Sequence, residues 1–130
     1  MPDLDLVVVL VATVALFVLG AGYYAVLGDQ LARVSQAAAA GSQMPPWAIG
    51  VELGRCLVLA AVVAGVAAEA DVDGWAGGLL VGLALWVGFP FVLWTGAVVH
   101  ERTPPALAAI HAGDWLVKLL AVGVIVGAWQ

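Results

Sequence analysis

A stripe of polar side chains lies along a long apolar segment near the carboxyl end of the chain. Its members, His111, Asp114, Trp115 and Lys118, are spaced at i, i+3, i+4 and i+7, which places them on one face of a helix. An Asp or Lys near the middle of a membrane-spanning helix costs roughly 2.5–3.5 kcal/mol. We therefore expect this face to point toward other helices, where the charges can find partners.

Other polar and aromatic side chains lie near those ends of the apolar segments that are expected on the same side of the membrane. Tyr24 is near the end of the first segment, Glu52 and Arg55 are near the start of the second, and Trp94 and His100 are near the end of the third. A helical bundle with these faces inward would hold one polar pocket open to the cytoplasm. The candidate residues for binding a ligand or ion are Glu52, Arg55, His111, Asp114, Lys118, Trp115, Tyr24, Trp94 and His100.

The four charged members of this set allow a structural or a functional interpretation. Their formal charges sum to zero, so Glu52–Arg55 and Asp114–Lys118 could pair within single helices, or a pair such as Arg55–Asp114 could join two helices. Alternatively, charges this costly mark a ligand, ion or proton site. His111 is then the central residue, because only imidazole titrates near neutral pH unperturbed, and Asp114 could orient it.

The histidines and tryptophans also have structural interpretations. His111 could be a hydrogen-bonded packing residue, and His100 could be an exposed loop residue or a helix cap. Trp94 and Trp115 fit core packing as well as an aromatic pocket for an apolar or cationic ligand.

No catalytic or metal-ligating residue is assigned from the sequence. Neither Glu-x-x-His nor His-x-x-x-His spacing occurs, and Cys56 has no recognisable partner for nucleophilic catalysis. Whether the chain is an enzyme therefore stays open, with a role other than catalysis favoured, and its cofactors are unknown.

The composition is that of an integral membrane protein. Of the 130 residues, 65% are hydrophobic and 10% are charged, whereas soluble domains are about 45–50% apolar and about 25% charged. The net charge is −5, with 4 Lys and Arg residues and no basic cluster. Nucleic-acid binding and membrane binding through a polybasic tail are therefore not supported.

The hydrophobic pattern predicts one all-α domain over residues 1–130, a bundle of four transmembrane helices. The expected spans are about 4–27, 47–68, 75–99 and 105–129. Gly28 to Pro46 is expected to be a polar connection that could hold a short interfacial helix. Pro90 should bend the third span, because proline removes a backbone hydrogen bond.

Three of the spans carry glycines four residues apart, a spacing that lets helix backbones approach closely. The pairs are Gly50/Gly54, Gly78/Gly82 and Gly123/Gly127. They could serve inside the bundle or at the interface of a homo-oligomer. A dimer is expected, because one bundle of this size leaves little room for a transport path.

Charge asymmetry predicts the orientation in the inner or plasma membrane. Arg33 and Arg102 belong to the two connections on one side, and the Glu69 to Gly74 turn on the other side is acidic. The positive-inside rule puts the arginine side in the cytoplasm. Both termini of this multi-pass protein are then extracytoplasmic.

Three short stretches resemble the small bacterial membrane proteins grouped as domain-of-unknown-function family 1761. They are Gly20 to Tyr24, Gly82 to Phe89, and His100 to Pro104 followed by Ile110 to Gly113. Their order and spacing match over nearly the whole chain. The resemblance implies a compact helical membrane domain and supplies no reaction, substrate or catalytic residue.

The leading functional prediction is that the cytoplasm-facing pocket binds or translocates a small solute, a proton or other ion, or a lipid. One alternative is a structural or assembly subunit of a membrane complex. The other is a membrane-embedded oxidoreductase or metalloenzyme. The expected partners are membrane lipids, a second copy of the chain and a small-molecule ligand.

Overall fold

The computed structural model describes residues 5–34 and 46–129, and these residues form an all-α fold with no strand among them. The helices are α1 (Leu6–Val34), α3 (Pro46–Glu69), α4 (Gly74–Gly88), α5 (Pro90–His100) and α6 (Pro105–Trp129). Together, α4 and α5 make one interrupted span. The described residues therefore contain 4 segments that are long and apolar enough to cross a membrane, which confirms the predicted fold class.

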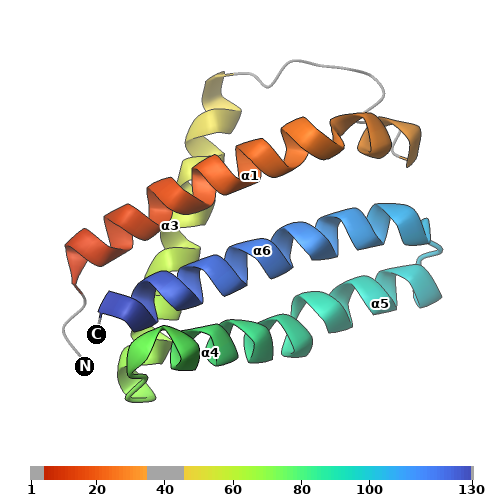
Figure 1. The fold of residues 1–130 in the computed structure, drawn as a ribbon. Coiled ribbons are helices and arrows are strands. Elements are labelled where there is room, and N and C mark those ends of the chain that lie inside the picture. Colours follow the sequence, from red (N-terminus) through yellow and green to blue (C-terminus); the bar gives the residue numbers. More distant parts are fainter. Residues whose placement is uncertain (1–4, 35–45, 130) are drawn as a thin grey trace.

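The long C-terminal helix α6 lies between α1 on one side and α4–α5 on the other, and it runs antiparallel to both (Figure 1). Helix α3 crosses behind them. The start of α1 and the end of α6 meet at one end of the bundle, where Trp129 Nε1 donates to Asp5 Oδ2 over 3.1 Å. The other Asp5 oxygen accepts the backbone N–H of Val7 at 2.9 Å and caps α1.

Helix α1 is longer than the hydrophobic pattern suggests. It continues without a break past Leu27 and Gly28 to Val34, so the first part of the expected polar connection belongs to this helix. Good helix formers follow Gly28, and Arg33 lies in the last turn, where a cation is favoured by the helix dipole. The rest of the connection, residues 35–45, lies outside the described residues.

The third span is interrupted at Phe89, as expected from the proline that follows. Helix α4 ends at Gly88, and Phe89 leaves helical geometry with φ −122° and ψ −77°. Its N–H donates to the Leu85 carbonyl at 3.0 Å. Pro90 then opens α5, a position where its missing N–H leaves no gap in the hydrogen-bonding pattern.

Glycines bring the backbones of α4 and α6 into direct contact. A Cβ added at Gly78 would collide with the Gly123 carbonyl oxygen, and one added at Gly127 would collide with that of Gly74. Two of the predicted glycine pairs therefore serve packing within one chain. The third pair, Gly50/Gly54 on α3, is exposed, and an added Cβ would meet nothing within 4 Å at either position.

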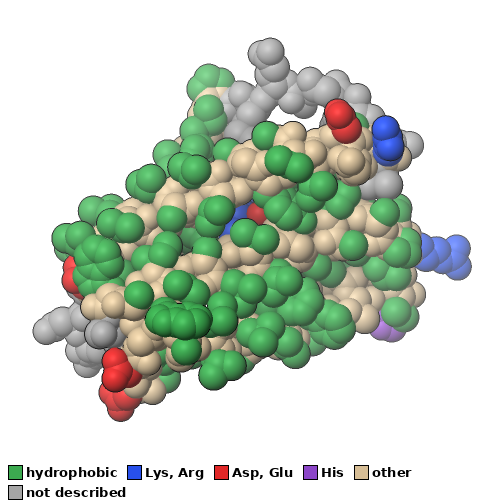
Figure 2. All heavy atoms as spheres, in the orientation of Figure 1, with side chains coloured by type: hydrophobic (Ala, Val, Ile, Leu, Met, Phe, Trp, Pro, Cys, Tyr) green, Lys and Arg blue, Asp and Glu red, His purple; other side chains and the backbone are tan. Residues whose placement is uncertain are grey.

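The packed core lies where α1, α3 and α6 meet, and the outer surface is apolar. Core residues include Val8, Val9, Ala12 and Leu16 of α1, Cys56, Ala60 and Val63 of α3, and Leu119, Val122 and Val126 of α6. Figure 2 shows apolar side chains over the middle of one face, with charged side chains at the two ends of the molecule. One small patch of acidic and basic atoms is visible between α1 and α6. Such a belt suits a multi-pass membrane protein.

Candidate functional site

Asp114 and Lys118 form a buried ion pair on α6. Each residue is 5% exposed, and the Lys118 Nζ lies 3.1 Å from Asp114 Oδ2. The two residues are one helical turn apart, so the pair forms within the helix, as one of the structural alternatives anticipated. Lys118 has room here because Gly20 of α1 faces it: an added Cβ would lie 3.1 Å from Lys118 Cε.

Glu52 of α3 extends this pair into a chain of alternating charges. Its Oε1 lies 3.5 Å from Lys118 Nζ, and its Oε2 lies 2.7 Å from Arg55 Nη1. The contact that joins two helices is therefore Glu52–Lys118, and not the Arg55–Asp114 pair considered from the sequence. Arg55 stays at the rim, with 58% of its side chain exposed.

Tyr24 of α1 connects the charges to His111. Its hydroxyl donates to Asp114 Oδ2 at 3.3 Å and lies 2.9 Å from His111 Nδ1. A phenol has a single proton, so when Tyr24 donates to Asp114 it accepts from an Nδ1–H of His111. The geometry thus links the imidazole tautomer to the carboxylate through one hydroxyl group.

Aromatic rings hold His111 between helices. The Trp94 indole of α5 stacks on the imidazole, with ring centroids 5.0 Å apart and planes 15° from parallel. Tyr24 approaches from α1 with a centroid distance of 5.9 Å. Trp115 lies beside the charges instead, with Lys118 Nζ 6.0 Å from its ring centroid, at the limit of a cation–π contact.

Two buried polar atoms in this region have no hydrogen-bond partner among the described residues. They are Asp114 Oδ1 and Trp94 Nε1. A buried carboxylate oxygen without a partner is costly. Asp114 is therefore paired through one oxygen and free to take a proton, water or ligand at the other.

The structure brings eight of the nine candidate residues into one connected cluster and leaves His100 apart. His100 is the exposed last residue of α5, and no hydrogen bond or ion pair found in residues 5–34 and 46–129 joins it to the cluster. Within the same ranges, no group of three or more His, Cys, Asp and Glu side chains could hold a metal ion.

Sequence reasoning missed several residues that position the cluster. The Tyr23 hydroxyl donates to the carbonyl of Ile110, one turn before Asp114. A Cβ on Gly113 would press against that same hydroxyl. Gly20, Tyr23 and Tyr24 are spaced at i, i+3 and i+4, so helical spacing could have identified this face of α1 as the partner of α6.

Beside the cluster lies an apolar groove of about 570 Å³, bounded by α3, by the break between α4 and α5, and by α6. Trp115, whose ring centroid lies 6.0 Å from Lys118 Nζ, is one of the residues that line it. A second, smaller pocket of about 340 Å³ lies between α5 and α6, against Trp86, Phe91 and Trp94.

Comparison with known protein families gives a match that covers most of the chain. A family model described as a protein of unknown function, DUF1761, matches residues 7–127. A search of curated proteins and a search of solved structures found no match. Because the match covers nearly the whole chain, and agrees with the resemblance carried by the three short stretches, the protein belongs to the DUF1761 family.

Proposed function

We propose that this membrane protein binds protons reversibly on the cluster formed by Glu52, Lys118, Asp114, Tyr24 and His111. The observation that carries the proposal is the continuity of this cluster. Successive polar atoms lie 3.5, 3.1, 3.3 and 2.9 Å apart along that order. Every member is a titratable group, and the line spans α3, α6 and α1.

The spacing favours a proton over a larger ligand at this position. A solute could not enter between these groups without separating them, whereas a proton needs only a polar atom that can accept it. The unpartnered Asp114 Oδ1 supplies a place for a proton to rest. Protonation there would leave Lys118 paired with Glu52, so the buried ammonium would keep a partner of opposite charge.

The proposed access is from the cytoplasm. Arg33 lies in the last turn of α1 and Arg102 lies in the turn before α6, at the end of the bundle nearer to His111. Under the positive-inside rule, this end faces the cytoplasm and the termini face outward. Arg55, at the exposed rim of the cluster, would lie on the path by which protons enter.

Infrared difference spectroscopy of the reconstituted protein, recorded while the pH is changed, tests this function. We expect a protonated-carboxyl band that disappears in Asp114→Asn or Glu52→Gln. Glu101→Gln is the matched control, because Glu101 is an exposed carboxylate outside the cluster, and this variant should retain the band.

A double variant guards against loss of folding. Asp114→Asn combined with Lys118→Met removes one charge of each sign and leaves Glu52 paired with Arg55. The proposal fails if the wild-type protein gives no titrating carboxyl band. It also fails if the band survives in Glu52→Gln and in whichever Asp114 variant folds, because the charges then act as structural ion pairs.

A further inference from the structure

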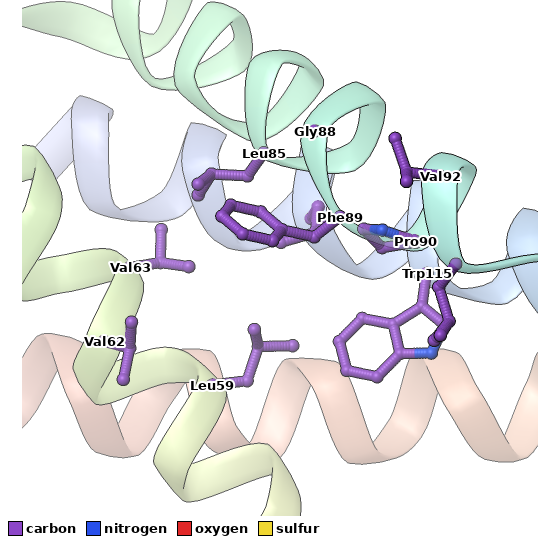
Figure 3. Close-up of a pocket in the computed structure, with 11 residues that line it drawn as sticks. Leu59, Val62, Val63, Leu85, Gly88, Phe89, Pro90, Val92 and Trp115 are labelled. Carbon is purple, nitrogen blue, oxygen red and sulfur yellow. The ribbon is translucent and has the colours of Figure 1, made fainter.

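The apolar groove is a second feature of the fold, separate from the proton cluster. It lies between α3 and the break at Phe89, and Figure 3 shows Leu59 and Val63 on one side facing Leu85 and Phe89 on the other. Trp115 stands at one end of this space. Its volume of about 570 Å³ is within the range of ligand pockets, about 300–1,000 Å³.

The break in the third span creates the groove. Gly88 lines it, and a Cβ added at Gly88 would meet nothing within 4 Å. Phe89 then leaves helical geometry, so the wall formed by α4 is not continued smoothly by α5. The break in the backbone therefore creates the space, and because residue 88 is a glycine, no side chain at that position fills it.

One basic side chain lies on α3 one turn before the first groove residue of that helix, toward the start of the helix. Arg55 precedes Leu59 by four residues and Val62 by seven, so the three share one stripe of α3. The Arg55 side chain is 58% exposed, although one of its nitrogens contacts Glu52. A long arginine in this position can extend its guanidinium toward the headgroup layer while its stem stays on apolar surface.

We infer that the groove holds one acyl chain of an anionic phospholipid, whose headgroup phosphate contacts Arg55. The apolar walls of the groove suit an apolar acyl chain. In a bilayer, the acyl chains of lipids surround the helices and can enter an opening between them. Charge complementarity selects the headgroup, because Arg55 is the basic residue on the stripe and guanidinium binds phosphate well. This recognition depends on a single arginine beside a shaped groove and needs no basic tail.

Native mass spectrometry tests the inference with vesicles of equal parts phosphatidylglycerol and phosphatidylcholine. The wild-type protein should leave the vesicles with phosphatidylglycerol bound, one per chain. Gly88→Leu should lose this bound lipid, because the new side chain enters the groove without striking another residue. Gly96→Leu is the matched control: it also meets nothing within 4 Å, and Gly96 does not line the groove.

Arg55→Ala separates the headgroup contact from the acyl chain contact. One basic residue near the membrane surface is worth about 1 kcal/mol toward an anionic lipid, which is about fivefold in affinity. We therefore expect Arg55→Ala to keep a bound lipid while its preference for phosphatidylglycerol falls about fivefold. Val92→Trp, at an exposed wall of the groove, is a second blocking variant if Gly88→Leu does not fold.

Three outcomes would overturn the inference. The first is equal lipid retention by the wild type and both blocking variants. The second is retention with no preference between the two headgroups. The third is a protein dimer that separates in Gly88→Leu, which would make a second copy the occupant. Each result is independent of the infrared test, because Gly88 and Val92 are not part of the proton cluster.

Discussion

Lys118 on α6 reaches Glu52 on α3, with 3.5 Å between the ammonium nitrogen and the carboxylate oxygen. This contact joins two helices whose other shared surface is apolar core. Lys118 also pairs with Asp114 on its own helix, so a single buried ammonium holds two carboxylates.

Removing Lys118 should destabilise the fold more than removing its whole pair. Lys118→Met leaves Asp114 buried without its opposite charge, which we expect to lower the free energy of unfolding by about 3–5 kcal/mol. Adding Asp114→Asn should recover most of this loss, because no uncompensated charge is then left in the pair. Steric-trapping measurements in bicelles would report both values. If the losses in free energy of unfolding from the two single substitutions simply added in the double variant, Asp114 and Lys118 would not be coupled.

Tyr24→Phe should disconnect His111 from Asp114. The hydroxyl is the atom through which the imidazole and the carboxylate are linked, and loss of a buried partner costs about 1–3 kcal/mol. Nitrogen NMR of the imidazole should show a changed tautomer balance at His111, with His100 as the internal reference.

The neighbouring tyrosine provides the control for this experiment. Tyr23→Phe removes one hydroxyl one residue away, but that hydroxyl donates to the Ile110 carbonyl and not to His111. It should leave the His111 signals in place. Identical spectra for the Tyr24 and Tyr23 variants would argue against the proposed connection.

Gly78→Val should separate α4 from α6. A Cβ at this position overlaps the Gly123 carbonyl oxygen, and backbone cannot move aside as a flexible side chain can. We expect failure to fold or a large drop in the melting temperature, measured by circular dichroism in detergent. Gly65→Val adds the same side chain where nothing lies within 4 Å. It should melt close to the wild type, and equal losses in both variants would exclude close packing as the cause.

Single-cysteine labelling should report the orientation in the membrane. In a Cys56→Ala background, Asp73→Cys should react with a membrane-impermeant thiol reagent added to intact cells, and Glu101→Cys should not. Both positions are exposed and lie in turns at opposite ends of the bundle. The reverse labelling pattern would place the arginine-bearing end outside and contradict the proposed cytoplasmic access.

Much of the fold was predictable because the bilayer imposes simple requirements. Long apolar segments must be helices that satisfy their own backbone hydrogen bonds, and Pro90 had to interrupt one of them. The inward direction of Asp114 and Lys118 was also predictable, because helical spacing sets their shared face and lipid would not accept their charge. The end of α1 was not predictable from hydropathy, because Gly28 and the polar residues after it continue the helix without being apolar.

The sequence by itself determined the class of the protein, the number of membrane-spanning segments and the set of polar residues that had to avoid lipid. Only the tertiary structure decided that Glu52 pairs with Lys118 and that Tyr24 connects Asp114 to His111. It also left His100 outside the cluster and opened a groove next to Gly88. The physical reason is that periodicity fixes a residue's face on its own helix, whereas contacts depend on how close backbones approach and how helices are rotated. Here those quantities are set by glycines packed against carbonyl groups.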